Sequence, residues 1–296
     1  MRYAIGVDIG GTNIKCVAVD DDGAVRVQRC EPTGDEAGDW ARIVPELVAS
    51  IEADFGAAAE VGVASPGLAA RDGRTIAWMQ GRMAGVQGFD WSMHLARARP
   101  VPVLNDAHAA LLGEAWLGAA IGARDVVMLT LGTGIGGAAL VNGRLLRGTQ
   151  GRAGHVGHIT VDADGARDIV GMPGSLEDAM GDCTLAARSG GRFTTTAQLV
   201  AAYRDGDPDA TSVWLRSIRR LAVAIASLVN VLDPELIVLG GGISGAADAL
   251  FDPLAAQLDD IEWRPLGRPA RIVPAVLGPY AGALGAARHA LFPVTE

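Results

Sequence analysis

The chain carries the same glycine-rich pattern twice, once at its beginning and once near its middle. In each copy a short apolar run meets a tight turn of glycine and threonine, and a second apolar run follows; the copies lie at residues 5–15 and 128–140. Glycine allows positive φ and close approach, so such a turn exposes backbone N–H groups that can bind phosphate. Two such turns, the first with Asp8 at its mouth, predict two half-sites for one nucleotide.

Strand-like and helix-like segments alternate along both halves of the chain. Apolar residues at helical spacing predict a helix over 40–55 and a longer one over 213–232, which stops before Pro234. Strands alternating with helices, twice over, predict an α/β duplication with an interdomain cleft. Further strands are expected near 4–7, 14–19, 24–29, 61–64, 101–104, within 125–146 and at 236–239, and further helices over 107–117 and 281–291.

This alternation also suggests how the domains divide. We expect a small N-terminal α/β domain of residues 1–115 plus 281–296, because the last helix should return to the first domain. The large α/β domain would then contain residues 116–280. No long linker or low-complexity tract separates the two.

The composition fits a globular protein and argues against several other classes. The 296 residues are 49% hydrophobic and carry a formal net charge of −9, which disfavours nucleic acid as a partner because phosphate neutralisation needs basic clusters. The three cysteines, at 16, 30 and 183, include no close pair, which favours a reducing cytoplasm over a disulfide framework or a cysteine-based zinc site. The most apolar stretch, residues 221–239, is broken by polar residues and cannot span a bilayer. We expect a cytoplasmic protein without a signal peptide or a membrane partner.

Asp8 is an acid inside an otherwise apolar strand, followed at once by two glycines and a threonine. It could cap its own turn, but a carboxylate at a phosphate-binding turn also suits Mg²⁺, which prefers oxygen ligands. Thr133, between two glycines, would offer its hydroxyl and backbone donors to the same phosphates. The glycine triplet at 240–242, after a buried strand, is compatible with an ordinary turn and equally with room for adenine and ribose.

The pair Asn105-Asp106 stands where a strand should end at the cleft, and α/β sheets bind ligands at such ends. A helix N-cap is the simpler interpretation. Both can hold, with Asn105 as a substrate ligand and Asp106 as the general base. Phosphoryl transfer needs mainly alignment and one group that accepts the hydroxyl proton.

Two histidines three residues apart, His155 and His158, follow a glycine-rich approach. A metal pair is one interpretation, but nothing nearby supplies two more suitable ligands, so hydrogen bonding to a polyol substrate is favoured. Glu177 could join them, although by itself it would pass as an acid in the first turn of a helix.

Together these motifs resemble the ROK family of sugar kinases, which have the ribonuclease H-like, actin-type ATPase fold. The resemblance covers nearly the whole chain, and several motifs in the right order are far more specific than any one of them. The motifs are Asp8-Ile9-Gly10-Gly11-Thr12-Asn13, Leu104-Asn105-Asp106-Ala107, Leu131-Gly132-Thr133-Gly134-Ile135-Gly136-Gly137, and Asp233-Pro234-Glu235 followed by Leu239-Gly240-Gly241-Gly242.

The resemblance implies an ATP- and Mg²⁺-dependent kinase, working as a homodimer, that phosphorylates a hydroxyl of a hexose or hexose-like substrate. Asp106 would be the catalytic base, and Asp8 would hold Mg²⁺, directly or through water. The nucleotide would be bound by Asp8, Gly10, Gly11, Thr12, Asn13, Lys15, Gly132, Thr133, Gly134, Gly240, Gly241 and Gly242. The sugar would be bound by Asn105, His155, His158, Glu177 and Arg82.

Three departures from the family pattern lie on the sugar side. The family's zinc loop usually reads Cys-x-Cys-Gly-x-x-Gly-Cys-x-Glu, whereas residues 168–177 keep the glycines and the glutamate but have no cysteine. We therefore expect no zinc, and His158 would serve the sugar or the loop. His155 stands where glucokinase-like members carry a glutamate, and a histidine there resembles some N-acetylmannosamine kinases. The segment 78–83 lacks the Pro-Asn-Leu often seen in the sugar-facing loop.

The reaction type is therefore better supported than the substrate. Glucose is the default expectation, with N-acetylmannosamine or a cyclitol as alternatives. A function of another class, a non-catalytic sugar-sensing ROK protein, is discouraged by the retained Asp8 and Asp106. Sugar-responsive repressors of the family carry an additional helix-turn-helix, which we do not expect here because the phosphate motif starts at residue 5.

Overall fold

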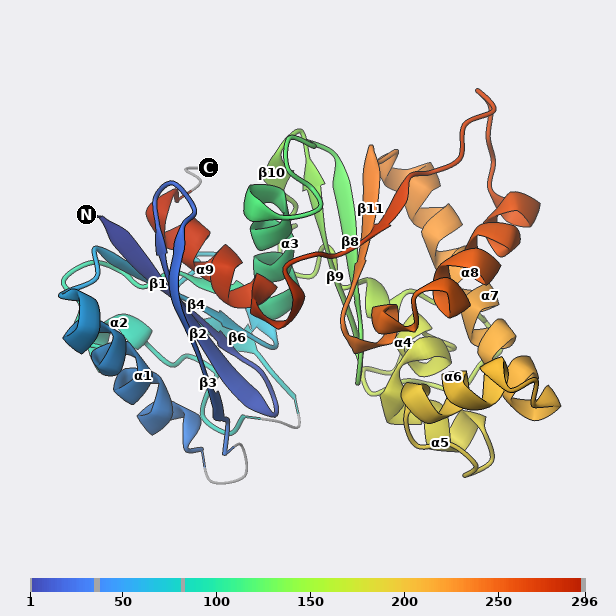
Figure 1. The fold of residues 1–296 in the computed structure, drawn as a ribbon, viewed down its shortest axis with the longest axis horizontal. Coiled ribbons are helices and arrows are strands. Elements are labelled where there is room, and N and C mark those ends of the chain that lie inside the picture. Colours follow the sequence, from blue (N-terminus) through green and yellow to red (C-terminus); the bar gives the residue numbers. More distant parts are fainter. Residues whose placement is uncertain (1, 35–37, 81–82, 294–296) are drawn as a thin grey trace. The chain divides into compact units, whose positions relative to one another are not determined.

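The computed structural model describes residues 2–34, 38–80 and 83–293, and its chain divides into two compact units. The first unit consists of Met1–Gly122, Arg144–Ala153 and Val276–Glu296, and the second of Ala123–Gly143 and Gly154–Ala275. The C-terminal segment therefore belongs to the first unit. So does the short segment Arg144–Ala153, which lies within the residue range expected for the large domain. The described residues form two five-stranded sheets, the first within the first unit and the second made by strands of the second unit together with its edge strand β10 (Arg144–Leu145) (Figure 1).

The sheet of the first unit combines an antiparallel meander with parallel strands, in the order β3-β2-β1-β4-β7. β1 pairs antiparallel with β2, and β2 with β3, while β1, β4 and β7 run parallel. The carboxyl ends of the three parallel strands therefore lie at one edge of the sheet. The strands are β1 (Tyr3–Ile9), β2 (Asn13–Asp20), β3 (Val25–Pro32), β4 (Glu60–Ser65) and β7 (Val103–Asn105).

One face of this sheet is covered by α1 (Trp40–Phe55), whose bounds are those predicted from its apolar spacing. The apolar side chains along one side of α1 pack on alternate residues of β1, which include Ile5 and Val7. α2 (Trp91–His94) lies beside it and is capped by Asp90. A two-stranded ribbon, β5 (Leu68–Ala69) and β6 (Ile76–Trp78), follows β4 in the chain.

The other face is covered by α9 (Ala281–Leu291), which also packs against α3 (Asp106–Leu117). Gly6 and Gly62 are paired across β1 and β4 beneath α9. A Cβ on Gly6 would lie 1.9 Å from the carbonyl oxygen of Ala283. The paired glycines therefore form the notch that lets α9 lie directly on the strands.

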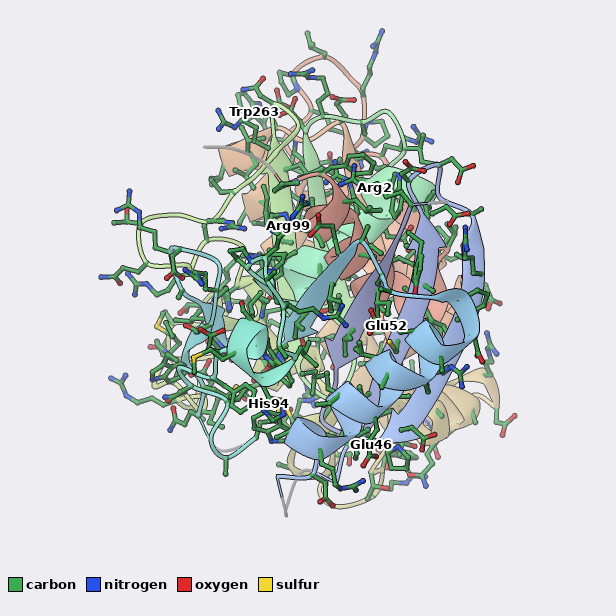
Figure 2. The ribbon with its side chains drawn as sticks, turned by 90° about the vertical axis from the view of Figure 1, so that its left-hand side faces the viewer. Arg2, Glu46, Glu52, His94, Arg99 and Trp263 are labelled. Atoms are coloured by element: carbon green, nitrogen blue, oxygen red, sulfur yellow. The ribbon has the colours of Figure 1, made fainter. Side chains whose placement is uncertain are left out.

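Exposed ion pairs cover the outer surface of the first unit. Arg97 and Glu52 of α1 form a partly buried pair. Arg2 and Arg99 are exposed, and both pair with Glu60 at the start of β4 (Arg2 and Arg99 are labelled in Figure 2). Such exposed pairs contribute about 1 kcal/mol or less each, because water screens them. The stability of the unit therefore comes chiefly from its two apolar layers.

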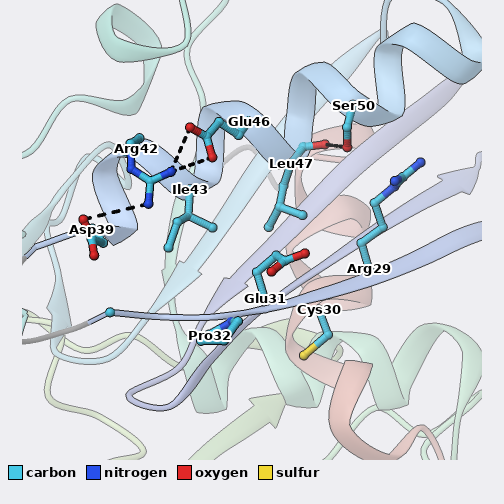
Figure 3. A pocket seen from close by; sticks show the side chains of 11 residues that line it. Arg29, Cys30, Glu31, Pro32, Asp39, Arg42, Ile43, Glu46, Leu47 and Ser50 are labelled. Atoms are coloured by element: carbon cyan, nitrogen blue, oxygen red, sulfur yellow. Dashed lines mark hydrogen bonds and ion pairs between the residues drawn. The ribbon is translucent and has the colours of Figure 1, made fainter.

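A groove of about 790 Å³ runs between β3 and α1 (Figure 3). Both of its arginines have acidic partners: Arg42 donates to Glu46 at 2.8 and 2.9 Å, and Arg29 pairs with Asp54. The cationic side chains of this groove are thus already neutralised.

The second sheet repeats the plan of the first, in the order β10-β9-β8-β11-β12. β8 and β9 form an antiparallel hairpin, and β11 runs parallel to both β8 and β12. The strands are β8 (Val126–Leu131), β9 (Ile135–Val141), β10 (Arg144–Leu145), β11 (Leu236–Gly240) and β12 (Ile272–Pro274).

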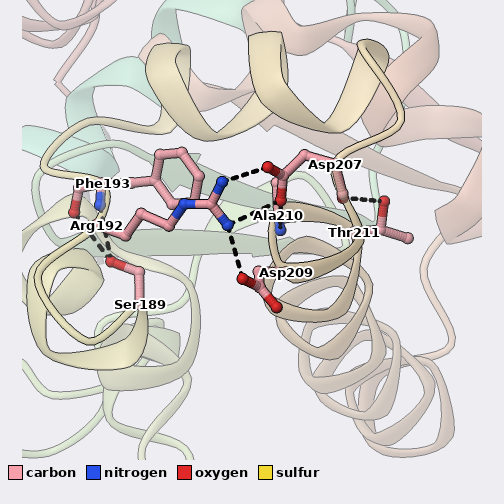
Figure 4. Close-up of polar contacts among 7 residues, drawn as sticks. All are labelled: Ser189, Arg192, Phe193, Asp207, Asp209, Ala210 and Thr211. Carbon is pink, nitrogen blue, oxygen red and sulfur yellow. Dashed lines mark hydrogen bonds and ion pairs between the residues drawn. The ribbon is translucent and has the colours of Figure 1, made fainter.

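The long helix α7 (Pro208–Leu232) begins five residues before the start predicted from periodicity, so the predicted start at 213 is wrong. Asp207 caps the helix by accepting the Ala210 N–H at 2.9 Å, and proline suits the first helical turn. Arg192 binds Asp207 and Asp209 and so ties this helix start to the preceding loop (Figure 4).

The other described helices of the second unit are all shorter than α7, and the longest of them, α8, packs against it. Among the described residues, no helix is long and apolar enough to cross a membrane. The helices are α4 (Leu176–Met180), α5 (Leu185–Arg188), α6 (Thr196–Arg204) and α8 (Asp248–Ile261), with short 3₁₀ turns η2 (Val156–His158), η3 (Asp182–Thr184), η4 (Gly242–Ala246) and, in the first unit, η5 (Gly278–Tyr280).

Candidate active site

Polar candidates gather at the carboxyl edge of the first sheet. Asp8 of β1 lies level with Ala64 of β4, and the next residue of β4, Ser65, lies level with Asn105 of β7. Asp106 follows directly as the first residue of α3. In α/β sheets, ligands bind in the space outside the carboxyl ends of the parallel strands, so this edge is where a ligand is expected. The fold thus brings Asp8 and the Asn105-Asp106 pair to the same edge.

The carboxyl group of Asp8 lies in a poorly solvated position, although part of the residue remains accessible. It packs against the first turn of α9, where a Cβ on Gly282 would lie 2.6 Å from its Oδ2. Burial and then the negative charge of Asp106 raise the pKa of Asp8 to about 7, against the lowering effect of Lys15. Lys15 is the cross-strand partner of Asp8 in β2. Asp8 and Asp106 are therefore electrostatically coupled.

Asn105 is the N-cap of α3. Its Oδ1 accepts the backbone N–H groups of Ala107 and His108 at 3.0 and 3.2 Å, and its Nδ2 donates to the Gly67 carbonyl at 3.0 Å. The side chain is buried, so these bonds fix the junction from β7 into α3. Asp106 is the next residue and begins α3, and its Oδ1 accepts the Ala107 N–H at 2.8 Å. The N-cap interpretation is thus confirmed, and a contact between Asn105 and a sugar stays a prediction.

The first phosphate-binding candidate is the turn between β1 and β2. The Gly10 N–H donates to the Asn13 carbonyl at 3.0 Å and closes the turn. Buried Thr33 holds it from behind: its N–H donates to the Thr12 carbonyl at 2.9 Å, and its hydroxyl donates to the Gly10 carbonyl at 2.6 Å. Thr33 thus binds carbonyl groups of the turn. A phosphate would bind N–H groups, so these bonds do not compete with it.

The second phosphate-binding candidate, the turn between β8 and β9, is held in a similar way. The Gly132 N–H donates to the Gly134 carbonyl at 3.0 Å. The carbonyls of Gly132 and Thr133 accept the N–H groups of Asp182 and Cys183 at 3.0 and 2.9 Å. The two turns therefore share one design: their carbonyls are bound by a segment behind them.

Glu177 has a structural contact beside the second turn. Its Oε2 accepts the Ile135 N–H at 2.9 Å, and a Cβ on Gly134 would lie 2.4 Å from the same oxygen. Only glycine fits at 134 while Glu177 makes this bond. Glu177 thus supports the second turn, and its predicted contact with the sugar rests on its other oxygen.

The glycines at 240–242 serve different purposes. Gly240 ends β11 in register with Thr130 of β8. Gly241 has a φ of +83°, and a Cβ there would lie 2.3 Å from the Leu131 carbonyl oxygen, so the fold itself requires glycine. A Cβ on Gly242 would meet no atom within 4 Å. Packing thus gives no reason for glycine at 242, and open space there is compatible with a nucleoside.

His158 is oriented by Asp168. The His158 Nδ1 lies 2.9 Å from the Asp168 Oδ2, and because a carboxylate only accepts, Nδ1–H is the donor. In the neutral imidazole Nε2 is then an acceptor, which suits a sugar hydroxyl. The Asp168 side chain is fully buried, whereas that of His158 is 30% exposed. Asp168 thus positions a partly accessible imidazole.

The same carboxylate organises the loop around it. The Asp168 Oδ1 accepts the N–H groups of Val170 and Met172 at 3.0 and 2.8 Å. Burial alone would raise the pKa of Asp168. Hydrogen bonds from the His158 ring, the loop N–H groups and the Ser175 hydroxyl outweigh burial and hold that pKa below its usual value. Asp168 therefore remains ionised at neutral pH and stabilises the loop at 168–175.

Two residues with structural roles here, Thr33 and Asp168, were missed from the sequence. Thr33 has no local signal, but Asp168 stands first in the segment matched to the zinc loop, where a buried polar residue could have been suspected. Among the described residues, no group of three or more histidine, cysteine or acidic side chains could hold a metal ion. Arg82, the remaining predicted sugar ligand, lies outside the described residues.

Comparison with known proteins decides the family. The model of the ROK family matches residues 4–292. The chain belongs to the ROK family. The predicted resemblance is thereby confirmed, and so is the α/β fold class, since solved ROK structures superimpose on nearly the whole chain.

Among similar curated proteins, a glucokinase of Thermotoga maritima is 32% identical, with 96% of this chain and 95% of that protein covered. An N-acetylmannosamine kinase of Escherichia fergusonii is 31% identical, with 86% and 88% covered. A ROK glucokinase structure from Streptomyces griseus, in complex with glucose and AMPPNP, is 28% identical with a TM-score of 0.82, covering 98% of this chain and 99% of that chain.

Proposed function

We propose that this ROK protein is an ATP-dependent kinase that transfers the γ-phosphate to a hydroxyl of a hexose or hexose-like sugar. One geometric observation carries the proposal: Asp8 near the end of β1 and Asp106 directly after β7 lie at the same carboxyl edge of the first sheet, where the charge of Asp106 helps to raise the pKa of Asp8. In this proposal the acid at the nucleotide turn and the candidate base belong to one site. Similarity to a glucokinase and to an N-acetylmannosamine kinase supports the same reaction class.

In this proposal Asp106 accepts the proton of the attacking hydroxyl. Asn105, bound at both ends of its amide, fixes the start of α3 and with it the backbone position of Asp106. The backbone N–H groups of the turns at 10–13 and 132–134 bind the phosphates. Such an arrangement suffices because phosphoryl transfer depends mainly on positioning and on stabilising charge.

We propose Mg²⁺ as the cofactor. Asp8 offers oxygen ligands of the kind Mg²⁺ prefers, and a cation would relieve the repulsion between Asp8 and Asp106. When bound, Mg²⁺ would neutralise charge on the phosphates. Since protein groups supply few ligands here, phosphate and water oxygens would complete the coordination, as is usual for this ion.

The sugar is proposed to bind His158 and His155, with the oriented Nε2 of His158 accepting one hydroxyl hydrogen bond. His155 differs from an ionised glutamate because neutral imidazole donates one hydrogen bond and accepts one, whereas carboxylate only accepts. A pocket with His155 therefore ranks sugars differently from a glucokinase pocket. Glucose, N-acetylmannosamine and a cyclitol remain the candidates.

The remaining expectations belong to the same proposal: a cytoplasmic homodimer that binds neither nucleic acid nor membrane. Its three cysteines are free thiols, which suits a reducing compartment. Its net charge of −9 disfavours nucleic-acid phosphates.

A coupled assay of ADP release tests the kinase proposal. Purified protein with ATP and Mg²⁺ would be screened against hexoses, acetamido sugars and cyclitols, with a sugar-free reaction as the baseline. We expect ADP release that depends on one sugar class. ADP release at the sugar-free rate for every compound would contradict a sugar kinase.

A further inference from the structure

A second cavity of the first unit lies beside the strand that ends in the catalytic segment. Its volume is about 270 Å³, below the roughly 300–1,000 Å³ typical of pockets for drug-sized ligands. Leu104 and His108, which flank Asn105-Asp106 in the chain, form part of its wall. The other lining residues are Ala69, Ala70, Arg71, Arg147, Gly148, Thr149 and Gly151.

The described lining of this cavity is cationic. Arg71 and Arg147 both line it, and none of the described lining residues carries a carboxylate. Within the described part of the chain, neither guanidinium forms an ion pair. By contrast, Arg42 in the groove of Figure 3 and Arg192 in Figure 4 have carboxylate partners. In a chain with net charge −9, two uncompensated arginines facing one small cavity indicate an anionic ligand.

Arg147 is also positioned by its neighbours. Its Nη2 donates to the Nε2 of buried His289 at 3.3 Å. Burial and then the charges of Arg147 and Arg288 lower the pKa of His289 to about 4, so that histidine is neutral at pH 7. A Cβ on Gly73 would lie 3.4 Å from the Arg147 Nη1. Arg147 is thus held by a neutral acceptor, which leaves its positive charge uncompensated.

Arg147 is followed by a loop, residues 148–151, that supplies further lining residues of the cavity. Gly148 and Gly151 have φ values of +70° and +76°, and a Cβ on Gly151 would lie 2.8 Å from the Ala69 carbonyl oxygen. The His108 Nε2 donates to the Ala153 carbonyl at 3.0 Å and ties this loop to α3. The loop therefore contacts both the β5 ribbon and the helix that starts at Asp106.

We propose that this space, the Arg71–Arg147 cavity, binds a small phosphoryl oxyanion. Arginine presents a planar fork of donors that matches phosphate oxygens, and the Thr149 hydroxyl adds a neutral donor. The volume suits a phosphate ion with a few waters or a short phosphorylated polyol. None of its lining residues is among those assigned to nucleotide or sugar, so this is a separate site next to the β7–α3 junction.

Calorimetric titration with inorganic phosphate, at constant ionic strength and with the nucleotide site saturated by AMPPNP, tests the proposal. Arg71→Gln and Arg147→Gln should each raise the Kd for phosphate about tenfold, equivalent to about 1.4 kcal/mol. Arg268→Gln is the matched control, since it removes an exposed arginine of the second unit. Arg71 is exposed, so its substitution should leave folding intact.

A parallel titration with glycerol 3-phosphate separates the two sources of the phosphoryl group. Tighter binding of glycerol 3-phosphate, weakened by the same two substitutions, identifies a phosphorylated polyol; equal or weaker binding identifies free phosphate. Absence of binding, or equal Kd values for wild type and both variants, would overturn the proposal. No turnover is needed, so failure of the proposed phosphoryl transfer to a sugar would leave this result unchanged.

Discussion

Replacing Asp8 by asparagine should stabilise the protein while it inactivates the enzyme. The pKa of this carboxyl is raised from 3.8 to about 7 in the folded chain. The folded state therefore binds the proton more tightly than the unfolded state does, and stability falls as pH rises from about 4 to about 7. A shift of about three pKa units, at about 1.4 kcal/mol each, means that the ionised Asp8 costs the folded state at most about 4 kcal/mol of stability above pH 7. Asparagine has the same shape and no charge, so it removes this cost.

The assay is the melting temperature of wild type and Asp8→Asn between pH 5 and pH 8, without nucleotide or Mg²⁺. One kcal/mol corresponds to about 2–4 °C for chains of roughly 150–250 residues and to somewhat less for a longer chain. The advantage of the variant should therefore grow with pH and reach several degrees at pH 8. Asp252→Asn, an exposed acid on α8, is the control and should show no such trend. A difference that does not change with pH would refute the assigned burial of Asp8.

Three further predictions concern the sugar side. Asp168→Ala should lower the melting temperature and raise the KM for sugar more than the KM for ATP. Asp168→Asn keeps an acceptor for His158, so its KM for sugar should stay close to that of the wild type. Equal KM values for sugar in the two variants would show that Asp168 does not position His158. His155→Glu should shift the kcat/KM ratio toward glucose roughly tenfold, since about 1.4 kcal/mol is tenfold, and an unchanged ratio measured beside the best substrate would leave His155 a structural histidine. Elemental analysis after dialysis against a chelator should find no stoichiometric zinc, and one zinc per chain would contradict the expectation drawn from the loop at 168–177.

Segments with strong local patterns were predicted well from the sequence. α1 (Trp40–Phe55) and α9 (Ala281–Leu291) have the predicted bounds, because apolar spacing and punctuating residues agree there. The predicted start of α7 is too late because apolar periodicity detects a helix only from its first periodic apolar residue. The helix begins earlier, where Asp207 caps it and Pro208 occupies its first turn. The β5–β6 ribbon was missed because strands of two and three residues carry no periodicity.

The candidate site divides in the same way. The shared edge of Asp8 and Asp106 follows from a topological rule about parallel strands, so the sequence could indicate it. The supports from Thr33 and Asp168 depend on hydrogen bonds across the fold, which no local pattern reveals. Glu177 was predicted from the sequence as a sugar ligand, but the sequence did not reveal that its carboxylate also supports the turn at 132–134 by accepting the Ile135 N–H.

The most direct test of the account is the turnover of Asp106→Asn with the best substrate, measured under conditions in which chemistry limits the rate. Asparagine keeps the size of the side chain but cannot accept the hydroxyl proton as a base, and a positioned base contributes about 10²–10⁴-fold. We predict a loss of kcat of that size, with the Kd values for sugar and AMPPNP changed by less than about threefold. A variant that keeps more than about half of the wild-type kcat would contradict the assignment of Asp106 as the base.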